Sequence, residues 1–336
     1  MIVSAQDAAG NQNRDDRAYG LMQSALALIP AGEWREAASR LEEAAGLHAE
    51  AGRSYDEVRC LQLAATLRRS GGEAGKARAL LDRAGAIAST DQPLTVSVSA
   101  EEAETAFAEG QYQRAATAWT KALDRAKKSG LKAEGISAML RRRAAAWMNL
   151  AEIDRANGDF DQAFQVLDAS GAKETARFVR TDQASLLWRH GCASQAEAVI
   201  ATLEAEIAPL EVSDALLSEI LVLRARFARA KGNLSEALEF SRRSRDAALQ
   251  AITPVSYFAG SVELAECLQT QENFTDAYGS LATAWATLAD LLGNETARSW
   301  IEPCLIAYQV RWGEPAFRIA KNEYEEQRRN ERKHEA

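Results

Sequence analysis

The side chains that could do chemistry in this chain are few and scattered. There are three histidines, and only His190 has a nucleophilic residue close by, because Gly191 and Cys192 follow it. A thiol beside an imidazole suggests a Cys–His nucleophile, which needs the two groups within hydrogen-bonding reach and a third group to orient the imidazole. Sequence neighbours at a turn rarely reach that geometry, and no orienting group is evident. We therefore interpret this segment as an ordinary turn.

Other reactive patterns are equally weak. The segment Gly71–Gly75 is rich in glycine but has neither the lysine nor the preceding strand of a phosphate-binding loop. Arg141–Arg143 would spread over about 200° of a helix surface, which favours a solvated face. The cysteines lack metal-ligand spacing, and we expect buried free thiols. These cysteines are Cys60, Cys192, Cys267 and Cys304. We predict a non-catalytic protein with no metal and no cofactor.

Composition excludes several classes of protein. The 336 residues carry a net charge of −8 with a pI near 5.2, which argues against a general nucleic-acid binder. No run of 18 apolar residues is present, so we expect no membrane span. The polar N-terminus does not resemble a signal peptide, and we expect a cytoplasmic protein. Richness in alanine and arginine is typical of a high-GC bacterial source.

The strongest signal is an internal repeat. A small residue, a variable residue, an aromatic or leucine, two polar residues and an alanine recur along the chain. Weaker copies begin at Gly72 and Gly191, where Ala77 and Ala196 keep the register. The clearest copies are Gly32–Ala37, Gly110–Ala115, Gly158–Ala163, Gly232–Ala237 and the shorter Asn273–Ala277.

Each copy predicts a tight turn between two helices. The glycine can end one helix in a left-handed conformation, in which a side chain would clash. The polar residue after it can cap the next helix. The alanine allows two helices to approach closely, and later apolar residues on the same face continue the contact. The repeating unit is therefore a helical hairpin that needs neighbours on both sides.

These residues resemble the second half of a tetratricopeptide repeat. The signature of that family's first helix is fainter, and Trp147, Leu150 and Ala151 come nearest to it. Turn glycines lie 33 to 48 residues apart, which indicates divergent repeats lengthened to about 40 residues. The resemblance implies an all-α fold, an α-solenoid of antiparallel helical hairpins in a tetratricopeptide-like superhelix, with about 7–8 hairpins.

Three segments depart from the pattern. We predict a disordered N-terminus over residues 1–13, a repeat array over 14–320 and a charged helical extension or tail over 321–336. Pro93 interrupts the array within 89–99, and we expect a long connection there that could serve as a hinge.

In the family that the repeats resemble, ligands usually lie in a groove lined by the first helix of each hairpin. Alignment on the turn glycines places several polar and aromatic side chains in that groove. We predict that six of them bind a partner: Arg155, Trp188, Arg189, Arg226, Arg229 and Glu266. Other predicted groove residues include Tyr19, Met22, Arg59, Gln62, Arg69, Glu104, Phe107, Met148, Glu152, Thr181, Glu219 and Gln269.

The predicted groove is rich in arginine although the chain is acidic. Arginine forks suit carboxylates, and Trp188 offers a flat anchor, so one interpretation is an acidic peptide segment as ligand. The alternative is that these arginines pair with glutamates on the next helix and Trp188 belongs to the core. The sequence leaves both open, and it does not reveal the oligomeric state.

Two functions follow from the resemblance. The first is a non-catalytic adaptor or scaffold that binds a protein partner in a helical groove. The alternative is a bacterial regulator whose repeat array senses a peptide or small ligand and changes conformation.

Overall fold

The structure is a computed structural model that describes residues 5–88, 92–208 and 210–335. Within those ranges every regular element is an α-helix, and the all-α prediction is confirmed. The helices in these ranges are α1 (Ala5–Leu28), α2 (Trp34–Glu50), α3 (Ser54–Ser70), α4 (Ala74–Ile87), α5 (Gln92–Ala108), α6 (Tyr112–Ser129), α7 (Ala133–Asn149), α8 (Ile153–Ala169), α9 (Lys173–Arg189), α10 (Ala193–Ile207), α11 (Asp214–Ala230), α12 (Leu234–Gln250), α13 (Pro254–Thr270), α14 (Phe274–Leu292), α15 (Asn294–Trp312) and α16 (Glu314–Glu335).

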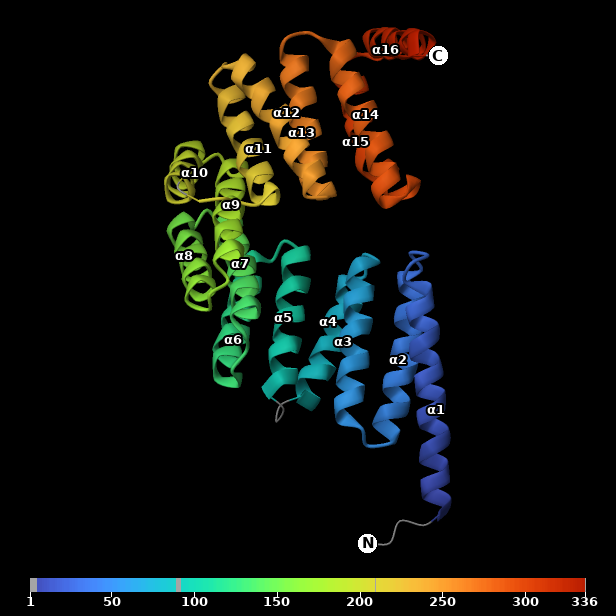
Figure 1. Ribbon diagram of the computed structural model, residues 1–336. Helices are drawn as coiled ribbons and strands as arrows, with labels where there is room; N and C mark the ends of the chain where they lie inside the picture. The colour runs from blue at the N-terminus through green and yellow to red at the C-terminus, as the bar shows by residue number, and fades with distance from the viewer. Residues whose placement is uncertain (1–4, 89–91, 209, 336) are drawn as a thin grey trace. The chain divides into compact units, whose positions relative to one another are not determined.

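The chain forms two compact units, residues 1–179 and 180–336, with the boundary inside α9. Within each unit, helices that follow one another in sequence pack side by side, as α11 to α14 do in unit 2 (Figure 1). The sixteen helices of the described ranges make eight consecutive pairs, in agreement with the predicted 7–8 hairpins.

The turns share one backbone geometry. At Gly72 (φ +77°) the amide donates to the Arg69 carbonyl at 3.0 Å, and the next amide, of Glu73, donates to the Arg68 carbonyl at 2.7 Å. This pair of bonds is the Schellman motif, which satisfies the last carbonyls of a helix and requires a left-handed residue. Left-handed residues recur about every 20 positions, for example at Gly32, Gly52 and Gly72. One helix and one turn therefore occupy about 20 residues, and a hairpin occupies about 40.

The predicted register is wrong at one hairpin. Gly158 lies inside α8 rather than in a turn, and the left-handed residue before α8 is Ala151, with φ +59°. The turn has alanine where most of the other hairpins have glycine, so the sequence pattern does not mark it. Gly158 precedes an aromatic and an alanine, and it therefore matches the turn pattern although it lies in a helix. When Ala151 is taken as the turn residue of the fourth hairpin instead of Gly158, the turn residues inside successive hairpins lie 38 to 41 residues apart. Those residues are at positions 32, 72, 110, 151, 191, 232, 272 and 313.

The segment expected to form a hinge is mostly helix. Residues 92–99 belong to α5, with Pro93 in its first turn, where the missing amide hydrogen has no helical partner to lose. Leu94 and Val98 are buried in a cluster with Leu61 of α3 and Leu81 of α4. The prediction of a loop is therefore wrong over 92–99, and residues 89–91 lie outside the described ranges.

The two ends of the chain are more helical than the sequence suggested. Helix α1 begins at Ala5, so most of the segment that we expected to be disordered is helical, with residues 1–4 outside the described ranges. Alanine and glutamine are good helix formers, and they extend the helix that continues to Leu28. At the other end, α16 runs to Glu335, which makes most of 321–336 a helical extension.

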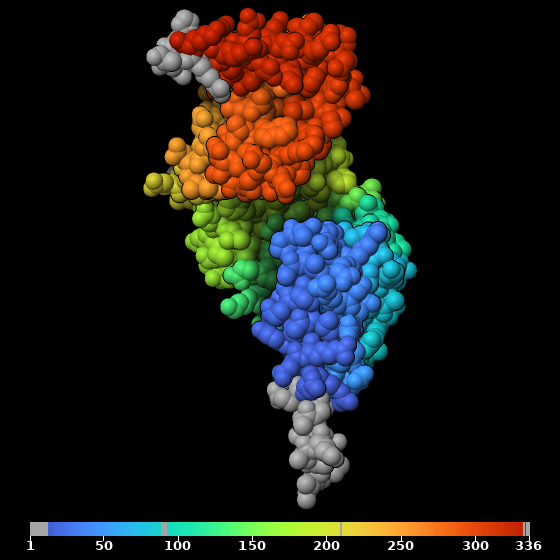
Figure 2. All heavy atoms as spheres, turned by 90° about the vertical axis from the view of Figure 1, so that its right-hand side faces the viewer, coloured from blue at the N-terminus to red at the C-terminus, as the bar shows by residue number. Residues whose placement is uncertain are grey.

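Helix α16 packs against α14, and its atoms lie on those of the preceding hairpin (Figure 2). Tyr324 of α16 contacts Tyr278 of α14 with ring centroids 5.7 Å apart. The neighbouring Gly279 makes this approach possible, since a Cβ there would lie 2.7 Å from the Tyr324 ring. A glycine on α14 thus fixes where the last helix packs.

Candidate functional site

The first helix of each hairpin presents one face built from equivalent positions. A position is numbered by how many residues it lies before the left-handed turn residue of the same hairpin. We call the side chains at positions 13, 10, 9, 6 and 3 the A-helix face. The spacings of three and one place these side chains along one side of a helix. Where the register is right, the predicted groove residues lie on this face, except Arg189, which is two residues before Gly191.

Equivalent hydrogen bonds join neighbouring A-helix faces. In unit 1, Gln62 at position 10 donates to Ser97 at position 13 of the next first helix, at 2.8 Å. In unit 2, Thr181 at position 10 donates to Glu219 at position 13 of α11. The same pair of repeat positions therefore connects successive hairpins in both units.

Ion pairs on this face repeat in the same way. Arg69 at position 3 of α3 lies 2.9 Å from Glu101 at position 9 of α5. Arg229 at position 3 of α11 lies 2.6 Å from Glu263 at position 9 of α13. These inter-repeat pairs support the alternative that we left open for the groove arginines.

Glu263 also forms an ion pair with Arg226, whose Nε lies 3.5 Å from its second carboxylate oxygen. Only 4% of Glu263 is exposed, so this carboxylate depends on the two guanidiniums for its solvation. Burial lowers the pKa of Arg226, and the nearby charges of Arg229 and Arg189 act in the same direction. Burial also disfavours charge on Arg229, but the hydrogen bond and charge of Glu263 outweigh it and raise the pKa of Arg229.

Glu263 is not among the residues predicted from the sequence, whereas the nearby Glu266 is. Glu266 lies one helical turn further along α13 and accepts from Arg311 of α15 at 3.0 Å. Both glutamates therefore bind arginines of neighbouring first helices. An acidic residue at position 9 of the repeat would have been the signal for Glu263, since Glu101 occupies the same position in unit 1.

Trp188 and Arg189 end α9 on the side next to α11. The Trp188 ring is half-buried and packs on Phe227 of α11 with centroids 5.3 Å apart. Arg189 is exposed. Trp188 thus contributes to packing between hairpins and still offers part of its surface, while Arg189 is open to solvent.

Arg155 does not join this group. The register error at Gly158 placed it on a first helix, but it lies on α8, the second helix of its hairpin and part of unit 1. Its guanidinium lies 4.8 Å from the centre of the Trp147 ring and 3.9 Å from Glu152. The placement of Arg155 on the groove-lining face is therefore wrong.

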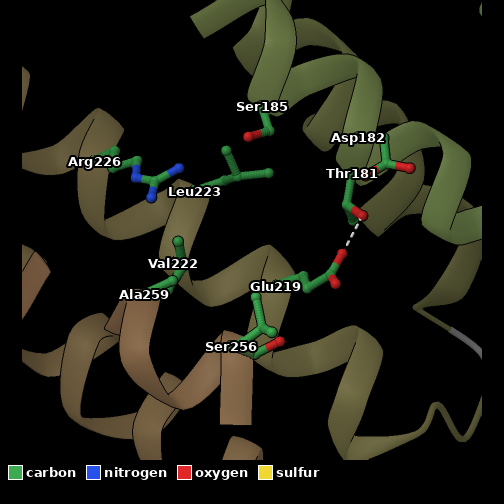
Figure 3. Close-up of a pocket in the computed structure, with 10 residues that line it drawn as sticks. Thr181, Asp182, Ser185, Glu219, Val222, Leu223, Arg226, Ser256 and Ala259 are labelled. Carbon is green, nitrogen blue, oxygen red and sulfur yellow. Dashed lines mark hydrogen bonds between the residues drawn. The ribbon is translucent and has the colours of Figure 1, made fainter. Parts of the chain in front are cut away.

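Helices α9, α11 and α13 line an open hollow of about 180 Å³ in unit 2, mostly with side chains of their A-helix faces. Its floor is apolar, and polar side chains lie around it: Arg226 on one side, Thr181 and Asp182 on the other (Figure 3). The lining residues are Thr181, Asp182, Ser185, Glu219, Val222, Leu223, Arg226, Val255, Ser256 and Ala259. A hollow with an apolar floor and a few convergent polar groups is typical of a binding site.

Unit 1 contains a second hollow between α5 and α7, built from the same repeat positions. Ala100, Glu101 and Glu104 line it at positions 10, 9 and 6. Glu101 pairs with Arg69, and Glu104 lies 3.3 Å from Arg142. Its carboxylates are thus engaged by arginines of neighbouring first helices.

The thiol of the candidate Cys–His pair contacts a backbone group. The Cys192 sulfur lies 3.9 Å from the backbone carbonyl of His190. The described residues contain no group of three or more side chains arranged to hold a metal ion. Among these residues, no helix is long and apolar enough to cross a bilayer.

Neither a scan against protein-family models nor a search of curated proteins finds a match for this chain. Solved structures do match. A STAND ATPase with a tetratricopeptide repeat sensor from Pyrococcus horikoshii aligns over 85% of this chain and 44% of its own, with 15% identity and a TM-score of 0.58. This chain thus spans less than half of that ATPase.

Two bacterial structures also match over most of this chain. Aspartyl phosphate phosphatase F from Bacillus subtilis has 11% identity and a TM-score of 0.55, covering 85% of this chain and 73% of its own. NprR bound to its cognate peptide NprX has 13% identity and a TM-score of 0.51, covering 88% and 84%. At these identities the likeness concerns the fold. The chain has a tetratricopeptide-repeat-like fold, as its sequence predicted.

Proposed function

We propose that this chain is a non-catalytic adaptor that binds a segment of a partner protein on the A-helix faces of α9, α11 and α13. The observation that carries the proposal is the hollow between these three helices, with Arg226 beside an apolar floor of Val222 and Leu223. Tetratricopeptide-like neighbours include a structure solved with a peptide, which supports the same kind of ligand.

The arginines favour an acidic partner segment, with Arg189 and Arg226 as its contacts. Arg229 has a different role in this proposal, because its hydrogen bond to the buried Glu263 holds α11 against α13. Reversing the charge of Arg229 would place two carboxylates together in a buried site and disturb the fold. The sharper test therefore changes Arg189 and Arg226 and leaves Arg229 in place.

The test is affinity enrichment of a partner from native lysate, quantified by mass spectrometry. We expect the double variant Arg189→Glu/Arg226→Gln to recover at least about tenfold less partner than the wild type, since it removes two cations and adds an anion. The matched control is Arg242→Glu/Arg243→Gln, which makes the same charge change at two exposed arginines of α12. Both variants must keep the circular dichroism and urea midpoint of the wild type, since Arg226 also pairs with Glu263. Equal recovery by both folded variants would contradict the proposed site.

A peptide-responsive regulator is the second candidate. NprR, a quorum sensor, and the repeat sensor of a STAND ATPase are among the similar folds, which supports a sensing role for such an array. A regulator would compact when its ligand binds, whereas a static adaptor would not. Small-angle scattering before and after addition of a bound peptide distinguishes them, and an unchanged radius of gyration would favour the adaptor.

A further inference from the structure

The turn between α12 and α13 contains an unfavourable residue at its centre. Ile252 has φ +52°, at a place where other turns between hairpins have glycine: Gly52, Gly130 and Gly171. A β-branched side chain is strongly disfavoured in the left-handed region. Among the described residues only Ala151 and Glu272 are also non-glycine residues with positive φ, and neither is β-branched.

Burial does not compensate for this strain. Ile252 is 70% exposed, and Val255, three residues later, is 67% exposed. Two large aliphatic side chains thus lie in solvent at the start of α13, one of them on strained backbone. Strained residues of this kind are concentrated at binding and catalytic sites, where a function retains them.

Val255 lines the hollow between α9, α11 and α13, next to Ser256 and Ala259 of the same helix. Val255 therefore lies at the edge of the same hollow as Val222 and Leu223, and the exposed Ile252 precedes it by three residues. We call Ile252 and Val255 the apolar lip of this hollow.

We propose that the apolar lip contacts the bound segment directly, and that this segment inserts a large apolar side chain into the hollow with an acidic residue beside it. The acidic residue is placed on the side of Arg226, away from the carboxylates of Asp182 and Glu219, which line the hollow on the side of Thr181 (Figure 3). This inference rests on the proposed function and deepens it, because it names the chemistry of the ligand and its contacts.

The test begins with phage-displayed random dodecapeptides panned on the full chain. Enriched peptides are expected to share a large apolar residue next to Asp or Glu. A synthetic copy of one is then titrated against Ile252→Gly and Val255→Ser, with Glu272→Gly as the matched control. Glu272 is an exposed left-handed residue in a turn within a hairpin, with φ +60°.

We expect the peptide to bind about fivefold or more weakly to both lip variants and equally well to the control, because only the lip variants lose apolar contact. The urea midpoint should rise for both glycine variants, because each removes strain at a left-handed residue. Unchanged binding to both lip variants would overturn the inference, as would a lowered urea midpoint for Ile252→Gly, which would give Ile252 a structural role.

The same peptide separates this inference from the proposed function. If the peptide fails to bind Arg189→Glu/Arg226→Gln and still binds both lip variants fully, that result would reject contact with the apolar lip and support the proposed binding site. Full binding in all of these variants would reject both. Failure to enrich any peptide, or a consensus without an apolar and an acidic residue, would also overturn the inference.

Discussion

Arg229 Nε of α11 lies 2.6 Å from Glu263 Oε1 of α13, and Arg69 and Glu101 form the same contact between α3 and α5. In both pairs the arginine is three residues before its turn and the glutamate nine residues before the next one. The repeat therefore preserves an ion pair between successive first helices as well as an apolar pattern. Such a pair fixes how two hairpins pack, because a buried carboxylate needs its partner.

We expect Glu263→Ala to lower the free energy of unfolding by about 2 kcal/mol, measured by urea denaturation. The carboxylate is nearly fully buried, and its loss leaves Arg226 and Arg229 facing each other without a counter-charge. Glu239→Ala is the control, because Glu239 is 70% exposed and lies 3.9 Å from Arg243 on the same helix. That change should alter stability by less than about 0.5 kcal/mol, and equal effects would refute a structural role for Glu263.

The register of the fourth hairpin can be tested with two opposite substitutions. Gly158 lies inside α8, and a Cβ there would meet nothing within 4 Å, so Gly158→Ala should stabilise the protein by about 0.5–1 kcal/mol. Ala151→Gly should also stabilise, because glycine adopts φ +59° without strain.

Gly110→Ala is the control for these two changes. Gly110 is left-handed, with φ +72°, so an alanine there should destabilise by about 1 kcal/mol. If the turn were at Gly158, the alanine variant at that position would behave like the one at Gly110. Thermal unfolding of the three variants distinguishes the two registers.

The sequence predicted the helical repeat because glycine, aromatic and alanine recur at fixed spacing, and packing demands those residue types. The predicted turn of the fourth hairpin is seven residues too late, because Ala151 occupies a position where most of the other hairpins have glycine, and alanine does not indicate a turn. The loop expected around Pro93 was wrong over residues 92–99, because a proline in the first turn of a helix is as favourable as one in a loop. Glu263 was missed because solvation by Arg226 and Arg229 is a three-dimensional property.

The buried thiols should react slowly. Burial raises the pKa of Cys60 and of Cys267 to about 11 in each case, with the nearby charges of Asp56 and Glu263 adding to the increase. At pH 8 only about one in a thousand of these thiols is ionised, and the thiolate is the reactive form. Alkylation of the native protein at pH 8, read by peptide mass spectrometry, should therefore label Cys192 first. Equal labelling of Cys60 in the native state would contradict its burial.

The same pKa increase has a consequence for stability. In the unfolded chain these thiols ionise near pH 9, whereas in the folded protein they hold their protons to about pH 11. Between those values the unfolded state binds fewer protons, so stability decreases as the pH rises. The double variant Cys60→Ala/Cys267→Ala should lose less stability from pH 9 to pH 10.5 than the wild type. An identical decline in both proteins would show that other groups cause it.

The packing of α16 on α14 depends on the absence of a side chain at Gly279. An alanine there would lie 2.7 Å from the Tyr324 ring, too close for carbon atoms, so Gly279→Ala should displace α16 even though alanine favours helix. We expect faster hydrogen exchange in residues 314–335, with the earlier helices of unit 2 unchanged. Gly46→Ala is the control, since nothing lies within 4 Å of a Cβ there. The double variant Gly279→Ala/Tyr324→Ala should exchange no faster than Tyr324→Ala alone, because the clash requires the ring. Independent, additive effects of the two changes would show that Gly279 does not act through Tyr324.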